Sequence, residues 1–556
     1  MVETATPTQD STAAEEPRRL TGGQALVESL KRHGVDTIFG LPGIQLDGFF
    51  HALYDARDAI RVLHTRHEQA TAYMADGYAR VTGREGVCCV VPGPGLLNAA
   101  AGLSTAYSCN SPVLCLTGQI RSDLIDRDTG VLHEIPNQIG MIRSVTKHAA
   151  RASTPEAIPA TVNEAFRQLR SGRPRPVEVE VPPDVLFAEA EIALPPSIGP
   201  RERSAGDPDL IDRAARLLGE AREPLIFVGG GIHRADAGEE LRTLAEMLQA
   251  PVIVSRNGKG SISDRHYLAQ GALAELEYLP RADVVLLVGT RFADILGTAR
   301  MTNPQQSVIQ LDIDPEEIGR NLSVAVGIEA DAKAGLAALV ERVGRYNRQR
   351  SSREAELTAF KQAATARINS VQPQADFALA IRAEMPDEGI IVNEFTQVGY
   401  WSYLGLPVYL PNTFLTPGYQ GTLGYGFTTA MGAKVGRPDV PVVSINGDGG
   451  FGFTLNELST LVQHDIRLTA VVFNDNAYGN VRRIQDQEYG GRIIGSELVN
   501  PDYGLLAKAF GIAGRRAETP AELRLQLREA IKADEPTLIE VPVGVMPNQR
   551  KALGIP

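Results

Sequence analysis

The sequence predicts an α/β protein with three domains, each built on a parallel sheet that is flanked by helices. Segments with apolar residues at helical spacing alternate with short apolar runs over most of the chain. Those runs are continuous rather than alternating in polarity, as in strands that are covered on both faces of a parallel sheet. With 556 residues, of which 43% are hydrophobic and 22% charged, the chain is long enough to bury three cores.

The first domain is expected over residues 19–187. Residues 1–18 before it are small, polar and acidic, and we expect a disordered tail, because they carry neither the apolar core of a signal peptide nor the arginine bias of a transit peptide. The segment GQALVESLKRHG is helix-like. The segments VDTIFGLPG, IRVLHT, GVCCVVPGPG and PVLCLTGQ are predicted strands with the loops that follow them, and VEVEVPPDV closes the domain.

A proline-rich link leads to a central domain, expected over residues 205–345, with strands at LIFVGGG, PVIVS, DVVLLVGT and VIQLDID. A polar, helix-forming stretch then connects it to a third domain, expected over residues 374–545, and residues 546–556 form a tail. No run of about 18 apolar residues occurs, so the sequence predicts no membrane-spanning helix.

Charge and cysteine content narrow the class of protein. The net charge of −12, without a basic tract, argues against nucleic acid or an anionic membrane as the main partner. The four cysteines have no zinc-like spacing and fall in or beside apolar runs, so we expect buried, reduced thiols at Cys88, Cys89, Cys109 and Cys115. Reduced thiols are typical of the cytoplasm, which is the location that we expect.

The third domain contains the clearest chemical signal. The apolar run at 442–445 ends in NGDGG, where successive glycines let the backbone turn sharply and expose N–H groups to a phosphate. A helix-like segment and a second apolar strand, LTAVVF, follow before Asp475. Because the carboxyl ends of neighbouring parallel strands lie side by side, Asp448 and Asp475 are expected to reach one hard cation that also binds diphosphate oxygens.

This pair of motifs resembles the thiamine diphosphate motif, in which GDG is followed after a βαβ unit by Asn-Asn or a related pair. Other motifs, in chain order, resemble the acetohydroxyacid synthase, pyruvate oxidase and 2-oxoacid decarboxylase superfamily over about residues 20–545: FGLPG at 39–43, RHE at 66–68, GPG at 93–95, TGQ at 117–119 and GTLGYG at 421–426. By this resemblance the domains are pyrimidine-binding, central and diphosphate-binding, and the enzyme is a homodimer or homotetramer.

The resemblance implies a set of residues for the cofactor and its metal ion. The metal ligands would be Asp448, Asp475 and the backbone carbonyl of Ala477; an Asn is commoner at the second place, and the added charge of Asp475 favours a divalent ion such as Mg²⁺. Leu423 would be the apolar wedge that bends the cofactor. The other cofactor-binding residues would be Pro42, Gly43 and Glu68 at the pyrimidine and Gln397, Val398, Gly449, Gly450, Tyr478 and Gly479 at the diphosphate.

Glu68 is the first catalytic candidate. By the family pattern it would hydrogen-bond N1′ of the pyrimidine and assist the proton transfer that activates the cofactor. The alternative interpretation is an acidic residue that merely suits the first turn of a helix. The reacting face would also be lined by Gln45, Gln119, His133 and Glu134. His133 is a candidate proton donor because its ordinary pKa is near neutral, and a structural loop histidine is the alternative.

Two departures from the synthase pattern are informative. The synthase run GxRFDDR supplies an arginine for the carboxylate of the second 2-oxo acid, whereas GTRFADILG places Ala293 and Ile295 in that region. Arg291 is three residues too early to replace it, so we interpret Arg291 as a structural or nucleotide contact. The GMHG stretch near the flavin is replaced by LAQGALAELEYL, which weakens the case for FAD. FAD, ADP or neither remains open for the central domain.

The sequence therefore predicts a thiamine diphosphate- and Mg²⁺-dependent enzyme that cleaves or forms a C–C bond next to the carbonyl of a 2-oxo acid or related substrate. Decarboxylation or carboligation of the lyase type is favoured. The alternatives are an acetolactate synthase-like transferase, a 2-hydroxyacyl-CoA lyase and a non-catalytic nucleotide-binding relative. Glu68 and Leu423 favour an enzyme. Arg550 and Lys551 are candidates to close on CoA or a carboxylate, or they belong to a solvated chain end.

Overall fold

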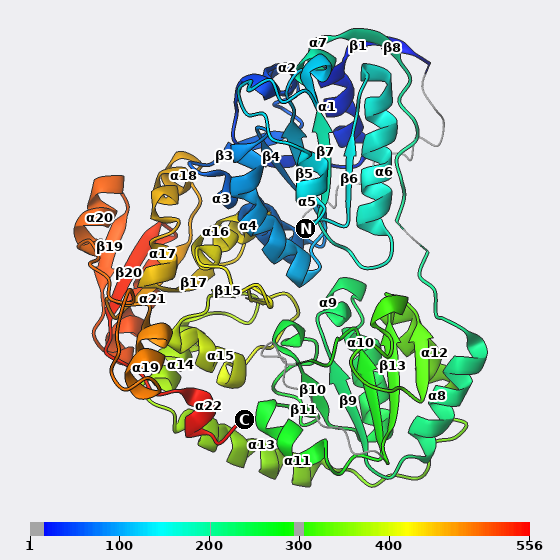
Figure 1. Cartoon of the computed structure of the whole chain (residues 1–556). Helices are drawn as coiled ribbons and strands as arrows, with labels where there is room; N and C mark the ends of the chain where they lie inside the picture. Colours follow the sequence, from blue (N-terminus) through cyan, green and yellow to red (C-terminus); the bar gives the residue numbers. More distant parts are fainter. Residues whose placement is uncertain (1–15, 201, 294–304, 556) are drawn as a thin grey trace. The chain divides into compact units, whose positions relative to one another are not determined.

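The computed structural model describes residues 16–200, 202–293 and 305–555 of the chain. These residues form two compact units: one comprises the described residues of 1–79 and 84–201, and the other comprises 80–83 and the described residues from 202 onward. Three six-stranded sheets, all with parallel pairing, lie in these units. The α/β class with three helix-flanked parallel sheets is thus confirmed (Figure 1).

The first unit is built on the sheet with strand order β3-β2-β4-β5-β7-β6. Its strands are β2 (Thr37–Gly40), β3 (Arg61–His64), β4 (Gly86–Val90), β5 (Val113–Gly118), β6 (His148–Arg151) and β7 (Val177–Val181). The helices are α1 (Gly22–Arg32), α2 (Asp47–Asp55), α3 (Glu68–Thr82), α4 (Pro94–Cys109), α5 (Gln138–Ile142), α6 (Ile158–Arg170) and α7 (Pro183–Phe187). Every residue of β4, β5 and β7 is buried, which explains why these runs show no polar alternation.

A two-stranded antiparallel ribbon pairs the beginning and end of this unit. Strand β1 (Arg18–Thr21) aligns with β8 (Glu189–Ile192), with Arg18 opposite Ile192. Thr21 then caps α1 in a capping box with Gln24, which satisfies backbone N–H groups at the start of the helix. Strand β1 begins within the segment expected to be a tail, and β8 follows residue 187. Sequence pattern did not indicate either strand, because both are short and half exposed.

The central sheet has the order β11-β10-β9-β12-β13-β14. Its strands are β9 (Pro224–Val228), β10 (Val252–Val254), β11 (Ala269–Gln270), β12 (Val284–Val288), β13 (Ser307–Asp312) and β14 (Val326–Glu329). Its helices are α8 (Pro208–Glu220), α9 (Gly231–Ala235), α10 (Gly238–Leu248), α11 (Ala272–Tyr278) and α12 (Ala332–Val343), and α13 (Glu354–Asn369) follows. The neighbouring strands β9 and β12 end at glycines that touch: a Cβ on Gly229 would lie 2.2 Å from the carbonyl oxygen of Gly289.

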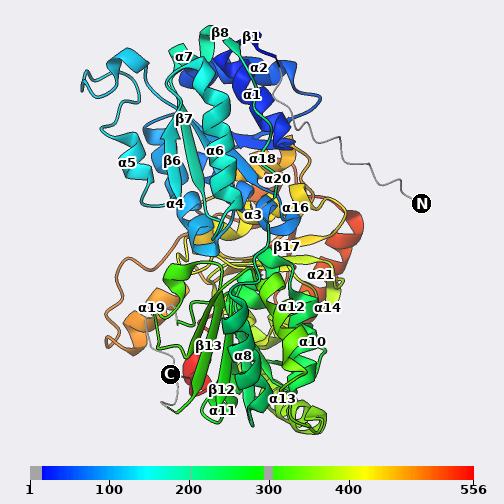
Figure 2. The same ribbon diagram turned by 90° about the vertical axis from the view of Figure 1, so that its right-hand side faces the viewer.

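The third sheet has the order β16-β15-β17-β18-β20-β19. Its strands are β15 (Ile390–Asn393), β16 (Phe414–Leu415), β17 (Val442–Gly447), β18 (Thr469–Asn474), β19 (Ala513–Arg516) and β20 (Thr537–Pro542). The helices are α14 (Gln374–Glu384), α15 (Gln397–Gly405), α16 (Tyr425–Gly436), α17 (Asp448–Phe451), α18 (Leu458–Gln463), α19 (Gly479–Gln487), α20 (Tyr503–Phe510), α21 (Pro520–Ala533) and α22 (Gln549–Ala552). Figure 2 shows these elements from the side.

Several expectations from the sequence are met within the described residues. Strands β17 and β18 are parallel neighbours, with Gly447 opposite Phe473, as the predicted βαβ unit requires. All four cysteines are free, and Cys88, Cys89 and Cys115 are buried as expected, whereas Cys109 at the end of α4 is partly exposed and departs from that expectation. None of the described helices is long and apolar enough to cross a membrane.

Candidate active site

The site residues predicted for the first unit lie directly after the carboxyl ends of its parallel strands. Gln45 follows β2, Glu68 follows β3, the GPG turn follows β4, and Gln119 follows β5. This is the edge at which open parallel sheets bind their ligands, because the loops from neighbouring strands converge there. The fold therefore brings these four segments, which are far apart in the sequence, to one edge.

Gln45 and His133 form a direct pair at this edge. Nδ1 of His133 lies 3.1 Å from Oε1 of Gln45, and Nε2 of Gln45 donates to the carbonyl of Leu132 at 3.2 Å. Because Oε1 of an amide only accepts, Nδ1 of His133 carries the proton, and Nε2 of the neutral ring is left with its lone pair. The backbone of His133 has a φ of 70°, a conformation that non-glycine residues adopt only when their surroundings impose it.

Glu68 is the first residue of α3, and one of its carboxylate oxygens accepts a hydrogen bond. Oε2 accepts a hydrogen bond from Nδ2 of Asn98 on α4 at 3.0 Å. The other oxygen, Oε1, faces Gly95, where a Cβ would come within 3.6 Å of it. The glycine of the GPG turn thus leaves space beside the second carboxylate oxygen, as a carboxylate that contacts a ligand needs.

Gln119 has a different role from the one expected of a residue on the reacting face. Its Nε2 lies 3.2 Å from both carboxylate oxygens of Glu180, and its Oε1 accepts from the N–H of Ile120 at 2.8 Å. Its side chain is 4% exposed. Because these bonds occupy both ends of the amide, Gln119 fixes the end of β5, and its assignment as a reacting residue stays a prediction without support from this geometry.

The centre of that network is Glu180, which the sequence did not single out. Arg151 and Gln138 also donate to its carboxylate, and Gln138 in turn accepts from the N–H of Gly93 in the GPG turn at 2.9 Å. The buried acid thereby ties the loops after β4 and β5 together. The only signal in the sequence was the unusual run VEVEV, whose two acids lie in a fully buried strand.

Glu134, which we expected to line the reacting face, forms hydrogen bonds within its own loop. Its Oε2 accepts from the backbone N–H groups of Gly130 at 2.7 Å and Val131 at 3.1 Å, so the side chain closes its own loop. These backbone hydrogen bonds outweigh the effect of burial and lower the pKa of Glu134. The expectation that Glu134 lines the reacting face therefore stays a prediction without support from this geometry, in which Glu134 stabilises the loop that carries His133.

In the second unit, two carboxylates share one site after β17 and β18. Asp448 is 3% exposed and lies at the first position of α17. Burial, reinforced by the charge of Asp448, raises the pKa of Asp475 to about 7, and burial also raises the pKa of Asp448. Two neighbouring buried carboxylates repel one another unless a proton or a cation lies between them. This donor set fits a hard divalent ion.

The backbone of Ala477 and the side chain of Asn500 also contact this pair of carboxylates. The N–H of Ala477 lies 3.2 Å from Oδ2 of Asp448, which places the loop expected to supply a carbonyl ligand beside the carboxylate. Nδ2 of Asn500 donates to the same oxygen at 2.6 Å and to Oδ1 of Asn474 at 2.9 Å. Asn500 was not predicted, since it lies in a segment without local pattern.

The glycine turn and α19 form a cradle beside the acidic pair. A Cβ on Gly449 would lie 2.7 Å from the ring of Tyr478, and a Cβ on Gly479 would lie 2.1 Å from Oδ2 of Asp475, so both positions require glycine. Gln397, at the start of α15, is 5% exposed, and its Nε2 has no partner among the described residues. A buried donor of this kind fits a phosphate oxygen.

Val398 differs from the residues of this cradle because its side chain is fully buried in the hydrophobic core. Only its backbone is therefore available to a ligand. Leu423 lies between Gly421 and Gly424, which have φ values of 61° and 84°. The left-handed conformation at both glycines makes the loop project its single apolar side chain. Leu423 is partly exposed, as a wedge against a ligand needs to be.

Glu394 is the main residue of this site that sequence reasoning missed. It follows β15 and is 2% exposed. Its carboxylate accepts from the N–H of Gly424 at 3.0 Å and from the N–H of Gly447 at 3.3 Å, so it joins the wedge loop to the metal turn. Burial raises its pKa to about 7, and these backbone donors oppose the shift. A Cβ on Gly450 would lie 2.3 Å from this carboxylate.

In the central domain, Arg291 lies beside an acidic and an aromatic side chain. Nε of Arg291 lies 3.7 Å from Oε1 of Glu317, and its guanidinium lies over the ring of Tyr419 at 4.7 Å, which agrees with a structural role. Ala293 is exposed, and Ile295 lies outside the described residues. At the chain end, Arg550 and Lys551 belong to α22, whose N-terminus is capped by Asn548.

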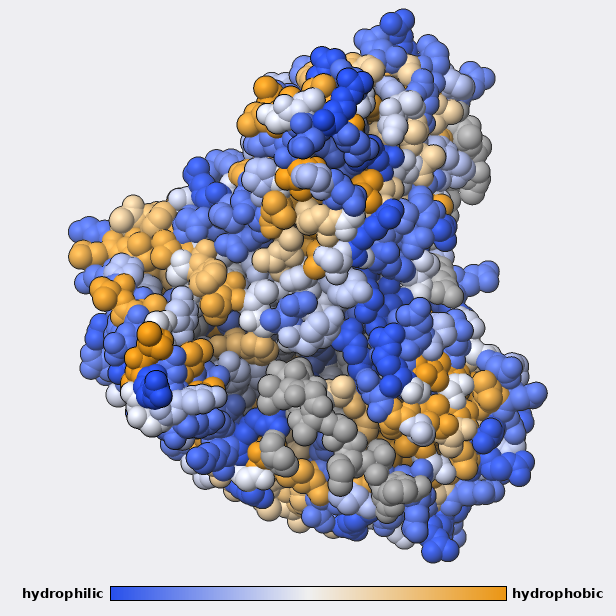
Figure 3. Space-filling view, in the orientation of Figure 1, coloured by the Kyte–Doolittle hydropathy of each residue, from blue (hydrophilic) through white to orange (hydrophobic). Residues whose placement is uncertain are grey.

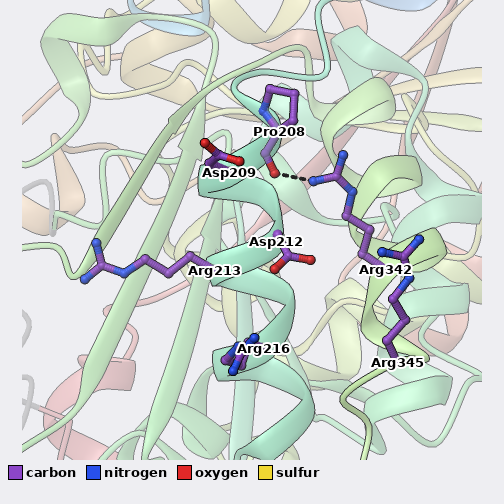
Figure 4. Close-up of a pocket in the computed structure, with 7 residues that line it drawn as sticks. All are labelled: Pro208, Asp209, Asp212, Arg213, Arg216, Arg342 and Arg345. Carbon is purple, nitrogen blue, oxygen red and sulfur yellow. Dashed lines mark hydrogen bonds between the residues drawn. The ribbon is translucent and has the colours of Figure 1, made fainter.

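A cavity of about 560 Å³ lies between α8 and α12 of this sheet (Figure 4). Its lining is charged, with Arg342 bonded to the carbonyl of Pro208 and Arg213 directed away from that pair. The cavity lies between helices that cover one face of the sheet rather than at the carboxyl ends of strands. We therefore do not assign it to the active site.

The two strand-end sites define an enzyme that binds a diphosphate cofactor, and comparison with known proteins gives the class. Three models of thiamine pyrophosphate enzymes match the chain: the N-terminal TPP-binding domain over residues 20–141, the central domain over 211–339 and the C-terminal TPP-binding domain over 394–541. The chain therefore belongs to the thiamine pyrophosphate (thiamine diphosphate) enzymes, as its motifs indicated.

Curated relatives span nearly the whole chain. A probable acetolactate synthase large subunit of Methanocaldococcus jannaschii is 35% identical over 551 residues, which cover 94% of this chain and 92% of that protein. A probable 2-ketoarginine decarboxylase of Pseudomonas aeruginosa is 35% identical over 535 residues, 94% of each chain. An acetolactate synthase of Arthrospira platensis is 33% identical over 554 residues, 95% of this chain and 94% of that protein.

Proposed function

We propose that this thiamine diphosphate enzyme also requires a divalent ion such as Mg²⁺ and cleaves or forms a C–C bond next to the carbonyl of a 2-oxo acid. The observation that carries the proposal is the pair formed by the buried Asp448 and the partly buried Asp475 beside the glycine cradle. Burial and the charge of Asp448 raise the pKa of Asp475, so a cation between the two carboxylates would relieve their repulsion. Bound thiamine diphosphate supplies a nucleophilic carbon and accepts the electrons released when carboxylate is lost from such a substrate.

The chain's own residues position that chemistry. Asp448, Asp475 and the carbonyl of Ala477 would hold the ion, and Gln397 and Gly479 lie where they would contact the diphosphate. Glu68 would hold the pyrimidine through Oε1, the oxygen that Asn98 leaves unoccupied. His133, with its proton fixed on Nδ1 by Gln45, presents Nε2 as the atom that takes up or returns a proton.

The candidate reactions differ in what happens to the substrate after decarboxylation. We favour decarboxylation or carboligation to a neutral acceptor, because Ala293 and Ile295 occupy the region where synthases carry an arginine for a second carboxylate. The relatives include both classes of enzyme, since one is named a probable decarboxylase and others are named acetolactate synthases. An acetolactate synthase-like transfer is therefore the second candidate.

We also propose that the working unit is a homodimer or a higher homo-oligomer. Large apolar side chains are exposed in both units, at Leu97, Phe453, Val462, Val481 and Leu505 among others. Figure 3 shows apolar residues gathered over the part of the chain that carries α19 and α20 in Figure 1. Exposed apolar patches of this kind are typical of surfaces that another chain covers.

Three incubations of the purified protein with thiamine diphosphate and Mg²⁺ test the proposed reaction: pyruvate alone, pyruvate with acetaldehyde, and 2-ketoarginine. The expected products are an aldehyde and a mixed acyloin, identified by mass spectrometry, with little acetolactate. A lost charge-assisted pair corresponds to about a ten- to hundredfold lower rate for a carboxylate acceptor. Efficient acetolactate formation from pyruvate would instead place the enzyme among the synthases, and failure of all three to react would remove pyruvate and 2-ketoarginine as substrates.

A further inference from the structure

Arg483 is buried with most of its hydrogen-bonding capacity unused. It lies on α19 and is 3% exposed. Its Nη2 donates to Oδ1 of Asn480 at 2.6 Å, while Nε and Nη1 are buried and have no partner among the described residues. No described carboxylate forms an ion pair with it. A guanidinium carries five N–H donors and keeps its charge at any physiological pH. The buried charge of Arg483 therefore lacks a counter-ion and most of its hydrogen-bond acceptors among the described residues.

Another buried arginine of the same unit, Arg382, has hydrogen-bond acceptors and an aromatic ring around its guanidinium. Arg382 is 7% exposed, but its Nη2 donates to the carbonyls of Met385 and Pro386 at 2.6 and 2.5 Å, and its guanidinium lies over the ring of Tyr409 at 5.4 Å. Burying a charge without such partners is costly, because neither water nor a counter-ion compensates it. Arg483 is therefore in the state expected of a binding residue before its anion arrives.

The helix positions show where Arg483 points. Residues four apart share one face of a helix, so Arg483 lies on the face of α19 that carries Gly479. That face meets α15, since a Cβ on Gly479 would lie 3.2 Å from Nε2 of Gln397. Tyr400 is three residues beyond Gln397 on α15. Burial raises the pKa of Tyr400, the charges of Arg256 and Arg483 oppose that shift, and the charge of Glu394 adds to it, so all three charged groups act on its hydroxyl.

A second cation, Arg256, lies beside the same helix α15. Arg256, in the loop after β10, lies over the ring of Tyr403 at 4.9 Å, one helical turn beyond Tyr400. Two arginines from separate segments thus approach α15 immediately beyond the diphosphate cradle. In a chain with a net charge of −12, the buried Arg483 and the partly exposed Arg256 beside the same helix favour an anionic ligand.

We propose that Arg483 and Tyr400 form a binding site for an oxyanion, one helical turn from the Gln397–Gly479 cradle. This inference rests on the proposed function, because the cradle defines which anions come within reach. Two sources share the chemistry: the terminal phosphate of the cofactor and the carboxylate of the 2-oxo acid. Both offer the planar or forked oxygens that a guanidinium binds through two parallel hydrogen bonds.

The test compares Arg483→Gln and Arg483→Lys with the wild-type protein. The control is Arg482→Gln, which removes the adjacent arginine, a partly exposed one paired with Glu497 at 3.5 Å. Calorimetric titration of each protein with thiamine diphosphate in the presence of Mg²⁺ measures the first source. Titration of the cofactor-loaded proteins with pyruvate, and the KM and kcat for pyruvate, measure the second.

Each result has a fixed meaning. If the phosphate is the ligand, Arg483→Gln weakens cofactor binding about ten- to hundredfold and Arg483→Lys recovers part of the loss. If the carboxylate is the ligand, cofactor affinity stays within twofold while pyruvate affinity falls and KM rises by that factor, with a smaller change in kcat. Affinities within twofold of the wild type for both ligands would overturn the proposal.

Two further measurements separate failure of this inference from other failures. Should wild-type protein not bind thiamine diphosphate at all, the proposed function fails, and the anion site is then tested with inorganic pyrophosphate alone. Stabilisation of the wild-type protein against heating by pyrophosphate that is smaller in Arg483→Lys supports the site, and equal stabilisation of both overturns it. This comparison also serves if Arg483→Gln does not fold, since lysine retains the buried charge.

Discussion

The carboxylate of Glu394 accepts a hydrogen bond from the backbone N–H of Gly424 at 3.0 Å. Its second oxygen accepts from Gly447, the residue before Asp448, at 3.3 Å. One buried acid thus sets the distance between the wedge loop and the metal turn.

We expect Glu394→Gln to weaken this connection, because an amide presents one acceptor and turns its NH₂ group toward a backbone donor. Leaving a buried donor unpaired costs about 1–3 kcal/mol. The free energy of unfolding in urea should fall by that amount, and calorimetry should show weaker binding of thiamine diphosphate with Mg²⁺. The matched control is Glu388→Gln, an exposed acid of the same unit. Equal behaviour of the two variants would contradict the role of Glu394.

Asp448→Ala should abolish joint binding of the cofactor and the ion, because the diphosphate of an anionic cofactor needs the bridging cation in a protein of net charge −12. Calorimetric titration with thiamine diphosphate, with and without Mg²⁺, measures both. Asp486→Ala, which removes an exposed aspartate of α19, is the control. Undiminished cofactor affinity after chelation of the metal would rule out the assignment of Asp448.

Glu68→Gln should retain the fold and the cofactor but slow proton exchange at C2 of the cofactor by roughly 10²-fold or more, the scale of a lost acid–base group. The amide keeps a hydrogen bond to the pyrimidine but does not share its proton. Hydrogen–deuterium exchange, followed by NMR after an acid quench, measures the step directly. Exchange at the wild-type rate, with full cofactor occupancy, would mean that Glu68 is structural.

His33 should make the stability of the protein depend on pH. It stacks on Phe166 at 4.0 Å, its Nδ1 donates to the carbonyl of Ser29 at 2.8 Å, and its Nε2 accepts from the N–H of Ile198 at 3.3 Å. A proton on Nε2 would break the last bond. Burial, with the nearby Arg170, lowers the pKa of His33 from 6.5 to about 4.

Because the folded pKa lies below the unfolded value, the unfolded chain binds more protons between pH 6.5 and 4. The contribution of neutral His33 is therefore complete above pH 6.5 and is lost as the pH falls toward 4, by about 3 kcal/mol in all. Urea unfolding of wild type and His33→Gln at pH 7.5, 5.5 and 4.5 measures it. The difference between the two proteins should shrink at low pH, and a constant difference would refute the prediction.

Sedimentation tests the expected oligomer. The exposed apolar side chains of both units predict that the protein sediments as a dimer or tetramer at micromolar concentration. Leu97→Asp and Val462→Asp introduce a charge into an exposed apolar position and should shift the distribution toward the monomer, while Leu276→Asp on α11 serves as an exposed comparison. A fully active monomer would contradict the proposal.

The sequence by itself determined the α/β class and the acidic pair. Continuous apolar runs predict strands that are buried on both faces, and consecutive parallel strands place their following residues at one edge, so Asp448 and Asp475 could be paired from their positions alone. Gln45, Glu68 and Gln119 were singled out by the resemblance to the family, and the structure places them after strands of the first unit. These are local properties, set by periodicity and by the turn that follows each strand.

Only the tertiary structure decided which polar groups are satisfied and which are left open. Glu394, Asn500 and Glu180 hydrogen-bond to residues that lie between 26 and 61 positions away in the chain, and no local pattern marks them. Gln119 and Glu134 were expected to line the reacting face, and in the structure both form hydrogen bonds within the fold. Arg483, by contrast, is buried without an anion. Desolvation and pairing depend on contacts between distant segments, and so they emerge only when the chain is folded.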